Sequence, residues 1–258
     1  MLRRRKKSPK PDRRPAAPSA GTRRRARPDA FVPAALIIDP ARESPGVVLV
    51  TGFEPFGGEA TNPSWQVAEM LPGTIAGLAV RKCLVPCEFR RAIEVVAAAI
   101  ERHDPALVVC LGQAGGRSRI GVERVAINVD DARAPDNAGR QPVDEPVAVG
   151  GPPAYFATLP VKAMVRAMRA AGAPAELSNS AGTYVCNHLM YGVLHYLAGS
   201  RRAARAGFVH VPYSEAQVLD RAGIAGMSLA TMARGIEAGI AAAAAHAEDI
   251  KVSEGTMD

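Results

Sequence analysis

The chain of 258 residues has little cysteine, with four residues at positions 83, 87, 110 and 186. A disulfide framework requires a denser set of cysteines in a much shorter chain, so we expect none. Cys83 and Cys87 lie close in sequence, but no second pair and no nearby histidine completes the ligand set that zinc requires. We therefore predict no metal ion and no other cofactor.

Long hydrophobic runs are also missing. A membrane-spanning helix needs about 18 or more apolar residues, and the alanine-rich segment near the C-terminus is interrupted by Arg234, Glu237 and His246. The apolar stretch 30–38 contains a proline, which argues against a secretory signal. We therefore expect a cytoplasmic protein.

Acidic residues are scarce in residues 1–28, which hold twelve Lys or Arg against Asp12 alone. The whole chain carries +7 and this segment +11, which leaves −4 for residues 29–258. Because prolines break the segment and apolar periodicity is absent, we predict a disordered, basic, proline-rich extension and linker over 1–45. Binding of nucleic acid or a membrane surface through this tail is an alternative function, but the segment lacks aromatic residues that stack on bases. We expect no nucleic-acid partner.

From residue 46 to residue 250, short apolar runs alternate with helical patterns. Glycine-rich loops, TGFEPFGG and GQAGGR, follow the first two apolar runs. This alternation is typical of a single α/β domain, a three-layer α/β/α sandwich with a mostly parallel, mixed sheet, and 251–258 is then a tail. The pattern predicts strands at 47–51, 107–111 and 207–211, and helices at 62–71, 92–102, 160–171, 183–199 and 228–247.

Cys186 lies near the start of the predicted helix 183–199. Thr183 is a suitable N-cap, which places Cys186 at about the third helical position. The unpaired N–H groups and the positive end of the helix dipole favour the thiolate there, so we expect a lowered pKa and a nucleophilic thiol. The competing interpretation is an ordinary buried cysteine.

His210 is the histidine that the topology brings to this thiol. The helix runs away from its N-terminus for ~22 Å, and the strand 207–211 returns over ~17 Å. His210 thus arrives beside Cys186 at the carboxyl end of a strand, where open α/β sheets build their sites. His188 and His195 lie on the same helix as Cys186 but cannot face it.

A catalytic imidazole needs a third group that fixes its tautomer, and Glu123, Asp130 and Asp131 are candidates. Glu123 interrupts an apolar pattern, so its carboxylate needs a partner. A salt bridge with Arg119 or Arg124 is an equally open interpretation of Glu123.

Several sequence blocks occur in order from about residue 47 to residue 250. They are VTGFEPFGG, NPSW, LGQAGGR, VERVAIN, ARAPDN, AGTYVCNH and FVHVPY. Together they resemble pyroglutamyl peptidase type I, also called pyrrolidone carboxyl peptidase. The resemblance implies a phosphorylase/hydrolase-like fold, homo-oligomers (dimers or tetramers), and a thiol exopeptidase. Such an enzyme removes N-terminal pyroglutamyl residues from peptides through a thioester.

By motif, the resemblance implies that Cys186 is the nucleophile, His210 the base and Glu123 the orienting acid. A pyroglutamyl ring is a small neutral lactam, so its pocket requires apolar walls and a few amide groups. Arg133 and the Cys186 backbone N–H are then candidates for stabilising the oxyanion. The implied substrate-binding residues are Phe53, Phe56, Gln113, Arg133 and Tyr184, although both phenylalanines are also compatible with an ordinary core.

The sequence departs from the family pattern at two positions. Ala134 stands where isoleucine is expected, and Tyr184 where phenylalanine is expected. Because both changes concern the implied pocket, an alternative function is the same triad acting on another small cyclic or acyl amide.

Overall fold

The computed structural model of the chain describes residues 46–255. The predicted extension 1–45 and the last three residues of the predicted tail lie outside the described residues. The elements, in chain order, are β1 (Val47–Phe53), α1 (Pro63–Met70), β2 (Thr74–Ile75), β3 (Leu78–Val85), α2 (Arg91–His103), β4 (Leu107–Gln113), β5 (Ile120–Glu123), β6 (Val125–Ile127), β7 (Ala154–Phe156), α3 (Val161–Ala170), β8 (Ala175–Ser178), α4 (Val185–Gly199), β9 (Arg205–Val211), β10 (Tyr213–Ser214), the 3₁₀-helix η1 (Glu215–Val218), β11 (Gly226–Met227) and α5 (Leu229–Ala245).

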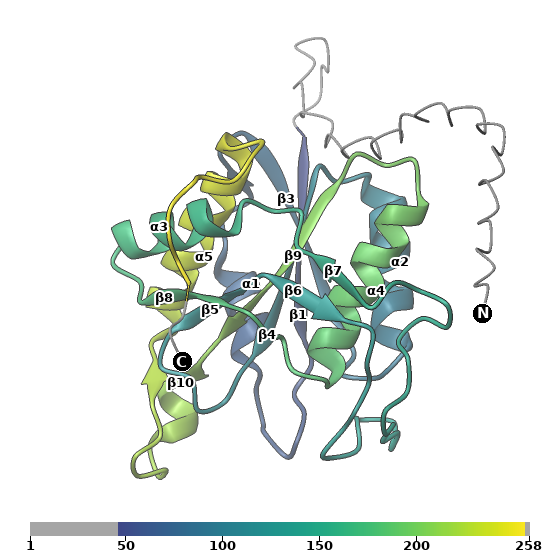
Figure 1. The fold of residues 1–258 in the computed structure, drawn as a ribbon. Coiled ribbons are helices and arrows are strands. Elements are labelled where there is room, and N and C mark those ends of the chain that lie inside the picture. The colour runs from purple at the N-terminus through teal and green to yellow at the C-terminus, as the bar shows by residue number, and fades with distance from the viewer. Residues whose placement is uncertain (1–45, 256–258) are drawn as a thin grey trace, which may run out of the picture. The chain divides into compact units, whose positions relative to one another are not determined.

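Seven strands form the central sheet, in the order β2-β3-β1-β4-β9-β5-β8. The strands β3, β1, β4 and β9 run parallel. β5 runs antiparallel to β9 and parallel to β8, and β2 runs antiparallel to β3. Helices α1, α3 and α5 cover one face of the sheet, and α2 and α4 cover the other (Figure 1). The predicted three-layer α/β/α sandwich with a mixed, mostly parallel sheet is confirmed.

The sheet separates two apolar cores because side chains alternate along each strand. In β1, Val48 and Val50 pack into the core under α1, α3 and α5, whereas Leu49 packs on the side of α2 and α4. In α5 a Cβ at Gly235 would lie 2.7 Å from the Ala173 Cβ, so only glycine permits this close approach. The apolar runs predicted as buried strands therefore have two buried faces.

Four strands of the central sheet, β2, β3, β5 and β8, were not predicted from the sequence. Two of them, β3 and β5, lie beside strands that were predicted. β3 has several partly or fully exposed side chains and no continuous apolar run. β5 is fully buried, but it contains Gly121 and Glu123 and is only four residues long. Both β3 and β5 therefore lack the continuous apolar run that identified β1, β4 and β9.

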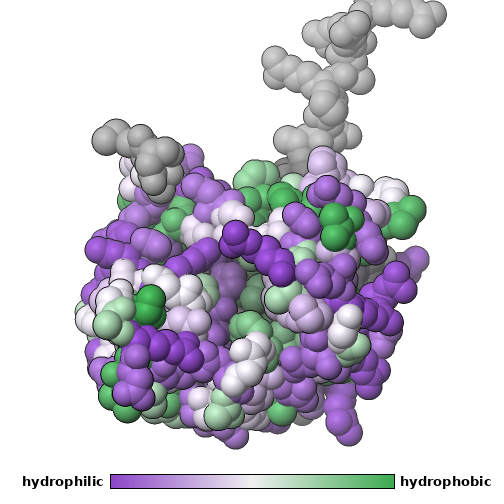
Figure 2. Space-filling view, turned by 90° about the horizontal axis from the view of Figure 1, so that it is seen from below, coloured by the Kyte–Doolittle hydropathy of each residue, from purple (hydrophilic) through white to green (hydrophobic). Residues whose placement is uncertain are grey.

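The carboxyl ends of β1, β4 and β9 meet at one edge of the sheet, the lower edge in Figure 1. The two predicted glycine-rich loops follow β1 and β4 at this edge. Seen from this side, the surface is hollowed near its centre, with apolar and hydrophilic residues intermixed around the hollow (Figure 2). The sheet edge thus collects the loops that bear the candidate side chains.

Candidate active site

A cavity of about 320 Å³ lies at this edge of the sheet. It is lined by side chains from β4, β9, the start of α4 and the loop after β1. Cys186 and His210, predicted as neighbours, both line it. Its lining residues are Phe56, Gly57, Glu59, Gln113, Gly115, Ala181, Tyr184, Cys186, His210 and Tyr213.

Cys186 is the second residue of α4, and the N-cap is Tyr184. The predicted cap was wrong by one residue, because the Thr183 hydroxyl donates to the Asp131 carbonyl at 2.7 Å and does not cap the helix. The first N–H groups of the helix, that of Cys186 among them, still lack intrahelical acceptors. The thiol therefore retains backbone donors beside it.

The predicted lowering of the pKa of the Cys186 thiol is wrong. Burial raises this pKa well above its ordinary value, and nearby Cys87 and Glu123 raise it further, while Arg117 lowers it. Packing against the sheet removes the solvent that would stabilise the thiolate. A neutral thiol at this position needs a base that removes its proton during attack.

His210 lies on β9 directly beside Gly112 of β4. A Cβ at Gly112 would lie 3.0 Å from the Cys186 Sγ and 2.6 Å from the Phe208 ring. The thiol thus sits against the backbone that neighbours His210, and a larger residue at 112 would displace it. No hydrogen bond joins the thiol to His210 among the described residues, so the two groups share the cavity without being paired.

Glu123 holds the imidazole of His210 from the protein interior. The His210 Nδ1 lies 2.7 Å from the Glu123 Oε1, and the Glu123 side chain is completely buried. The same oxygen accepts a hydrogen bond from the Arg117 Nη1 at 2.8 Å. Glu123 does form a salt bridge, which was one of the interpretations left open by the sequence. Its partner is Arg117, however, and Arg119 pairs with Glu176 instead. The His210 Nε2 has no hydrogen-bond partner in the described part of the chain.

The other predicted substrate-binding residues divide into two groups. Phe56, Gln113 and Tyr184 line the cavity, and the Phe56 and Tyr184 rings lie 6.2 Å apart. Phe53 and Arg133 do not line it: Phe53 is buried in the core against Phe208, and Arg133 is exposed. The roles of Phe53 and Arg133 in substrate binding remain predictions.

The two departures from the expected pattern also have different surroundings. The Tyr184 hydroxyl donates a hydrogen bond to the Pro135 carbonyl at 3.0 Å, so the additional oxygen has a partner. Ala134 is exposed and does not line the cavity.

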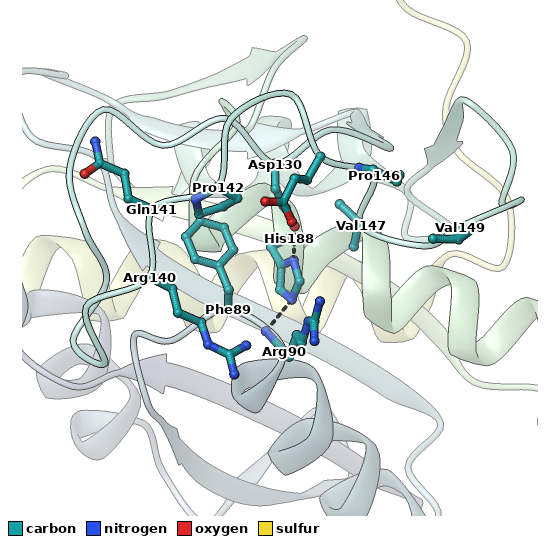
Figure 3. A pocket seen from close by; sticks show the side chains of 11 residues that line it. Phe89, Arg90, Asp130, Arg140, Gln141, Pro142, Pro146, Val147, Val149 and His188 are labelled. Carbon is teal, nitrogen blue, oxygen red and sulfur yellow. Dashed lines mark hydrogen bonds and ion pairs between the residues drawn. The ribbon is translucent and has the colours of Figure 1, made fainter.

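A second histidine–carboxylate pair borders another cavity, of about 570 Å³, which shares no lining residue with the first. The His188 Nδ1 lies 2.8 Å from the Asp130 Oδ2, and the His188 Nε2 accepts the Arg90 backbone N–H at 2.7 Å (Figure 3). The Phe89 ring packs edge-on against this imidazole at 5.3 Å. Both ring nitrogens of His188 are therefore occupied, and neither is available to a substrate.

The backbone that His188 binds is strained. Arg90 has a φ of +65° and a ψ of −51°. The Arg91 N–H donates to the Phe89 carbonyl at 2.8 Å, which closes a γ-turn around Arg90. A positive φ in such a turn is unfavourable for a residue with a side chain. The hydrogen bond to His188 holds this turn at the start of α2.

Residues 47–246 match the family model described as pyroglutamyl peptidase. The chain belongs to the pyroglutamyl peptidase family. This is a family of cysteine peptidases that remove N-terminal pyroglutamate, and the chain is an enzyme of this class.

Relatives from several bacteria support this assignment to the pyroglutamyl peptidase family. The pyrrolidone-carboxylate peptidase of Streptomyces coelicolor is 54% identical over 211 residues, which cover 81% of this chain and 97% of the relative. The pyrrolidone-carboxylate peptidase of Klebsiella pneumoniae is 53% identical over 209 residues, with the same coverage of 81% and 97%.

Solved structures of pyroglutamyl peptidases have the same fold. Pyroglutamyl peptidase I from Bacillus amyloliquefaciens superposes with a TM-score of 0.79 at 41% identity, covering 81% of this chain and all of the other. Pyrrolidone carboxyl peptidase from Thermococcus litoralis gives a TM-score of 0.77 at 38% identity, covering 81% and 99%.

Two polar residues at the candidate active site were not found from the sequence. Arg117 follows the GQAGG loop and reaches the Glu123 carboxylate. Gln217 of η1 donates to Gln113 at the rim of the cavity. Only the glycines beside Arg117 were a signal, since they mark a loop at which chain segments approach closely.

Two further properties of residues 46–255 concern metals and membranes. No group of three or more metal-ligating side chains occurs there. No helix in this part of the chain has the length and apolar character needed to cross a bilayer.

Proposed function

We propose that Cys186, His210 and Glu123 are the catalytic residues with which this chain cleaves the bond after an N-terminal pyroglutamyl residue. The observation that supports this assignment most strongly is the buried bond between the His210 Nδ1 and Glu123. This bond leaves the His210 Nε2 as the only free imidazole nitrogen in the cavity that Cys186 also lines. The arrangement has the roles of a nucleophile–base–acid triad.

In the first half of the reaction, the Cys186 Sγ attacks the carbonyl carbon of the pyroglutamyl residue while the His210 Nε2 takes the thiol proton. Glu123 stabilises the imidazolium that forms. The tetrahedral intermediate collapses when the C–N bond breaks, and His210 returns the proton to the leaving amine. The product is a thioester between Cys186 and the pyroglutamyl group.

In the second half, His210 removes a proton from water, and the resulting hydroxide attacks the thioester carbon. The C–S bond breaks, the thiolate regains its proton from His210, and pyroglutamate leaves. The tetrahedral oxyanion in both halves needs donors. The Cys186 N–H at the start of α4 is suitably placed to provide one, and a role for Arg133 remains a prediction.

The composition of the cavity supports a neutral lactam as the acyl group. Phe56 and Tyr184 provide aromatic walls, and Gln113 provides an amide. The cationic Arg117 does not line the cavity and is bonded to the Glu123 carboxylate, and the Glu59 carboxylate, which does line it, is paired with Arg221. A small uncharged ring therefore fits this cavity better than a charged side chain does.

The test is hydrolysis of a fluorogenic L-pyroglutamyl amide under reducing conditions. We expect release of the fluorophore by the wild-type chain and none by the Cys186→Ser variant. Circular dichroism of both proteins establishes that they are folded. No release by folded wild-type protein would reject the proposed activity.

We also propose that the chain forms homodimers or homotetramers. The resemblance to pyroglutamyl peptidases, among which homodimers and homotetramers are common, supports this proposal, and the exposed Phe156 and Leu219 are candidate interface residues. Light scattering coupled to size exclusion measures the mass, and a monomer at micromolar concentration contradicts the proposal.

A cytoplasmic location is proposed from cysteine chemistry. All four cysteines are free thiols, and free thiols persist in reducing compartments. Fractionation of cells that express the full chain tests this proposal.

A further inference from the structure

Three polar side chains from distant parts of the sequence meet at the rim of the candidate active site. Gln113 ends β4, Glu59 lies in the loop after β1, and Gln217 belongs to η1. The Gln217 Nε2 lies 3.0 Å from the Gln113 Oε1 and 3.1 Å from the Glu59 Oε2. Gln113 and Glu59 both line the cavity with Cys186, whereas Gln217 does not line it. Gln217 therefore contacts two lining residues without facing the cavity itself.

The orientation of the Gln217 amide follows from its partners. The backbone N–H of Ser214 approaches one end of this amide at 3.0 Å, and an N–H can only donate, so this end is the oxygen. The other end faces the Glu59 carboxylate, which in turn pairs with the Arg221 Nη2 at 2.7 Å. An ionised carboxylate accepts only, so the end facing it is the nitrogen.

The orientation of Gln113 then follows in turn. The atom of Gln113 that meets the Gln217 nitrogen must accept, so it is Oε1, and Nε2 is directed elsewhere. No described residue accepts a hydrogen bond from the Gln113 Nε2, although the side chain is 93% buried (7% exposed) and borders the cavity. The Gln113 Nε2 is not among the buried side-chain atoms that lack a partner, so it is accessible at the cavity, where a ligand or water can accept its hydrogen bond.

We propose that Gln217 is a positioning residue that turns the Gln113 amide so that its nitrogen donates to the ring carbonyl oxygen of the pyroglutamyl group. This inference rests on the proposed function. It adds that the wall of the pocket formed by Gln113 presents a hydrogen-bond donor. The wall offers a donor to the ring carbonyl. It therefore selects a lactam over a carbocycle of the same size.

The segment that bears Gln217 is anchored independently of substrate. The Arg221 guanidinium lies 5.1 Å from the centroid of the Tyr213 ring. Tyr213 packs so closely on Gly115 that a Cβ there would lie 2.3 Å from the Tyr213 hydroxyl. These contacts keep the segment against the cavity rim, so Gln217 is oriented before substrate binds.

The experiment compares three fluorogenic amides that differ only in the ring. The pyroglutamyl amide has a ring carbonyl and an N–H. The γ-lactone analogue keeps the carbonyl but has oxygen in place of the N–H, and the cyclopentanecarbonyl analogue has neither. The ratio of kcat/KM for the lactone to that for the cyclopentyl substrate reports recognition of the carbonyl alone.

For Gln217→Met, we expect this ratio to fall about 10- to 100-fold, while kcat/KM for the cyclopentyl substrate changes less than about threefold. For Gln217→Glu we expect a ratio at least as low, because a second acceptor facing Gln113 rotates its amide and turns the oxygen into the cavity. The matched control is Glu215→Gln, an exposed position in the same η1 that does not line the cavity. This control should retain the wild-type ratio.

Equal losses on all three substrates, or an unchanged ratio in Gln217→Met, would overturn the inference and leave a purely structural role. If Gln217→Met does not fold, Gln113→Met takes its place, and an unchanged ratio there overturns the inference as well. Failure of the proposed function gives a different result, because the wild-type chain then does not cleave the pyroglutamyl amide at all.

Discussion

The two histidine–carboxylate pairs of this chain have almost the same first bond but differ in the second nitrogen of the ring. His210 and His188 are both buried, and their Nδ1 atoms lie 2.7 and 2.8 Å from Glu123 and Asp130. The His188 Nε2 accepts the Arg90 N–H, whereas no described group binds the His210 Nε2. The free nitrogen, rather than the carboxylate, distinguishes the proposed base, His210, from the structural histidine, His188.

The carboxylates also differ in their other partners. Glu123 accepts hydrogen bonds from both His210 and Arg117. The remaining oxygens, the Glu123 Oε2 and the Asp130 Oδ1, are both buried without a partner, but no arginine or lysine pairs with Asp130 among the described residues. Loss of the histidine therefore exposes the two sites to different penalties.

The largest expected effect separates the histidines by activity. We expect His210→Ala to lower kcat by about 10³-fold or more, because the thiol loses its base. His188→Ala should keep kcat within about threefold for the folded fraction, because His188 has no nitrogen free for proton transfer. Steady-state kinetics on a pyroglutamyl amide measure both, and comparable losses of kcat would remove the distinction.

The carboxylates should follow the same division. Glu123→Gln is expected to reduce kcat by about 10³-fold, since an amide does not stabilise the imidazolium and disturbs the tautomer of His210. The equivalent change in the other pair, Asp130→Asn, should leave kcat near that of the wild type. If the two amide variants are equally active, Glu123 is not the orienting acid.

Stability should show the opposite order. We expect His188→Ala to lower the free energy of unfolding by about 2 to 4 kcal/mol, since the Arg90 N–H and the buried Asp130 both lose a partner. His210→Ala should cost less, because the Arg117 guanidinium still pairs with the Glu123 Oε1. Urea denaturation followed by circular dichroism measures both variants. A smaller loss for His188→Ala than for His210→Ala contradicts the structural role.

The smallest expected effect is on the reactivity of the Cys186 thiol when the positive charge of Arg117, the partner of Glu123, is removed. Arg117 lowers the pKa of the Cys186 thiol, so Arg117→Met should raise this pKa and decrease the thiolate fraction at any fixed pH. Because Arg117 is 31% exposed, solvent weakens its effect, and we expect inactivation by iodoacetamide to slow about threefold at pH 8. The control Arg119→Met removes a more exposed charge and should leave the rate unchanged. Faster inactivation of Arg117→Met is the opposite sign and rejects the argument.

The sequence was sufficient to place Cys186 and His210 in one cavity. This success depends on two regular elements, a helix and the strand that returns from it, whose rise per residue is fixed. Short continuous apolar runs identified β1, β4 and β9, because both faces of these strands are buried. The strands β2, β3, β5 and β8 were missed because exposed positions in β3 and the shortness of the other three removed that signal.

Properties that depend on tertiary contacts were not predicted. Local reasoning about the helix N-terminus gave the wrong direction for the pKa of Cys186, because it did not include the burial produced by packing against β4. It also placed the N-cap at Thr183, whose hydroxyl instead donates to Asp131. Gln217 lies 104 residues from Gln113, so no sequence spacing indicated their contact.

Gly112 has a consequence for judging which relatives are active. A methyl group there would lie 2.6 Å from the Phe208 ring and 3.0 Å from the Cys186 Sγ, yet it would replace none of the three proposed catalytic residues. A homologue with alanine at this position would pass every check for cysteine, histidine and glutamate while its nucleophile is displaced. The presence of cysteine, histidine and glutamate is therefore not sufficient to predict activity in a homologue. Glycine at position 112, which leaves room for the thiol, must be present as well.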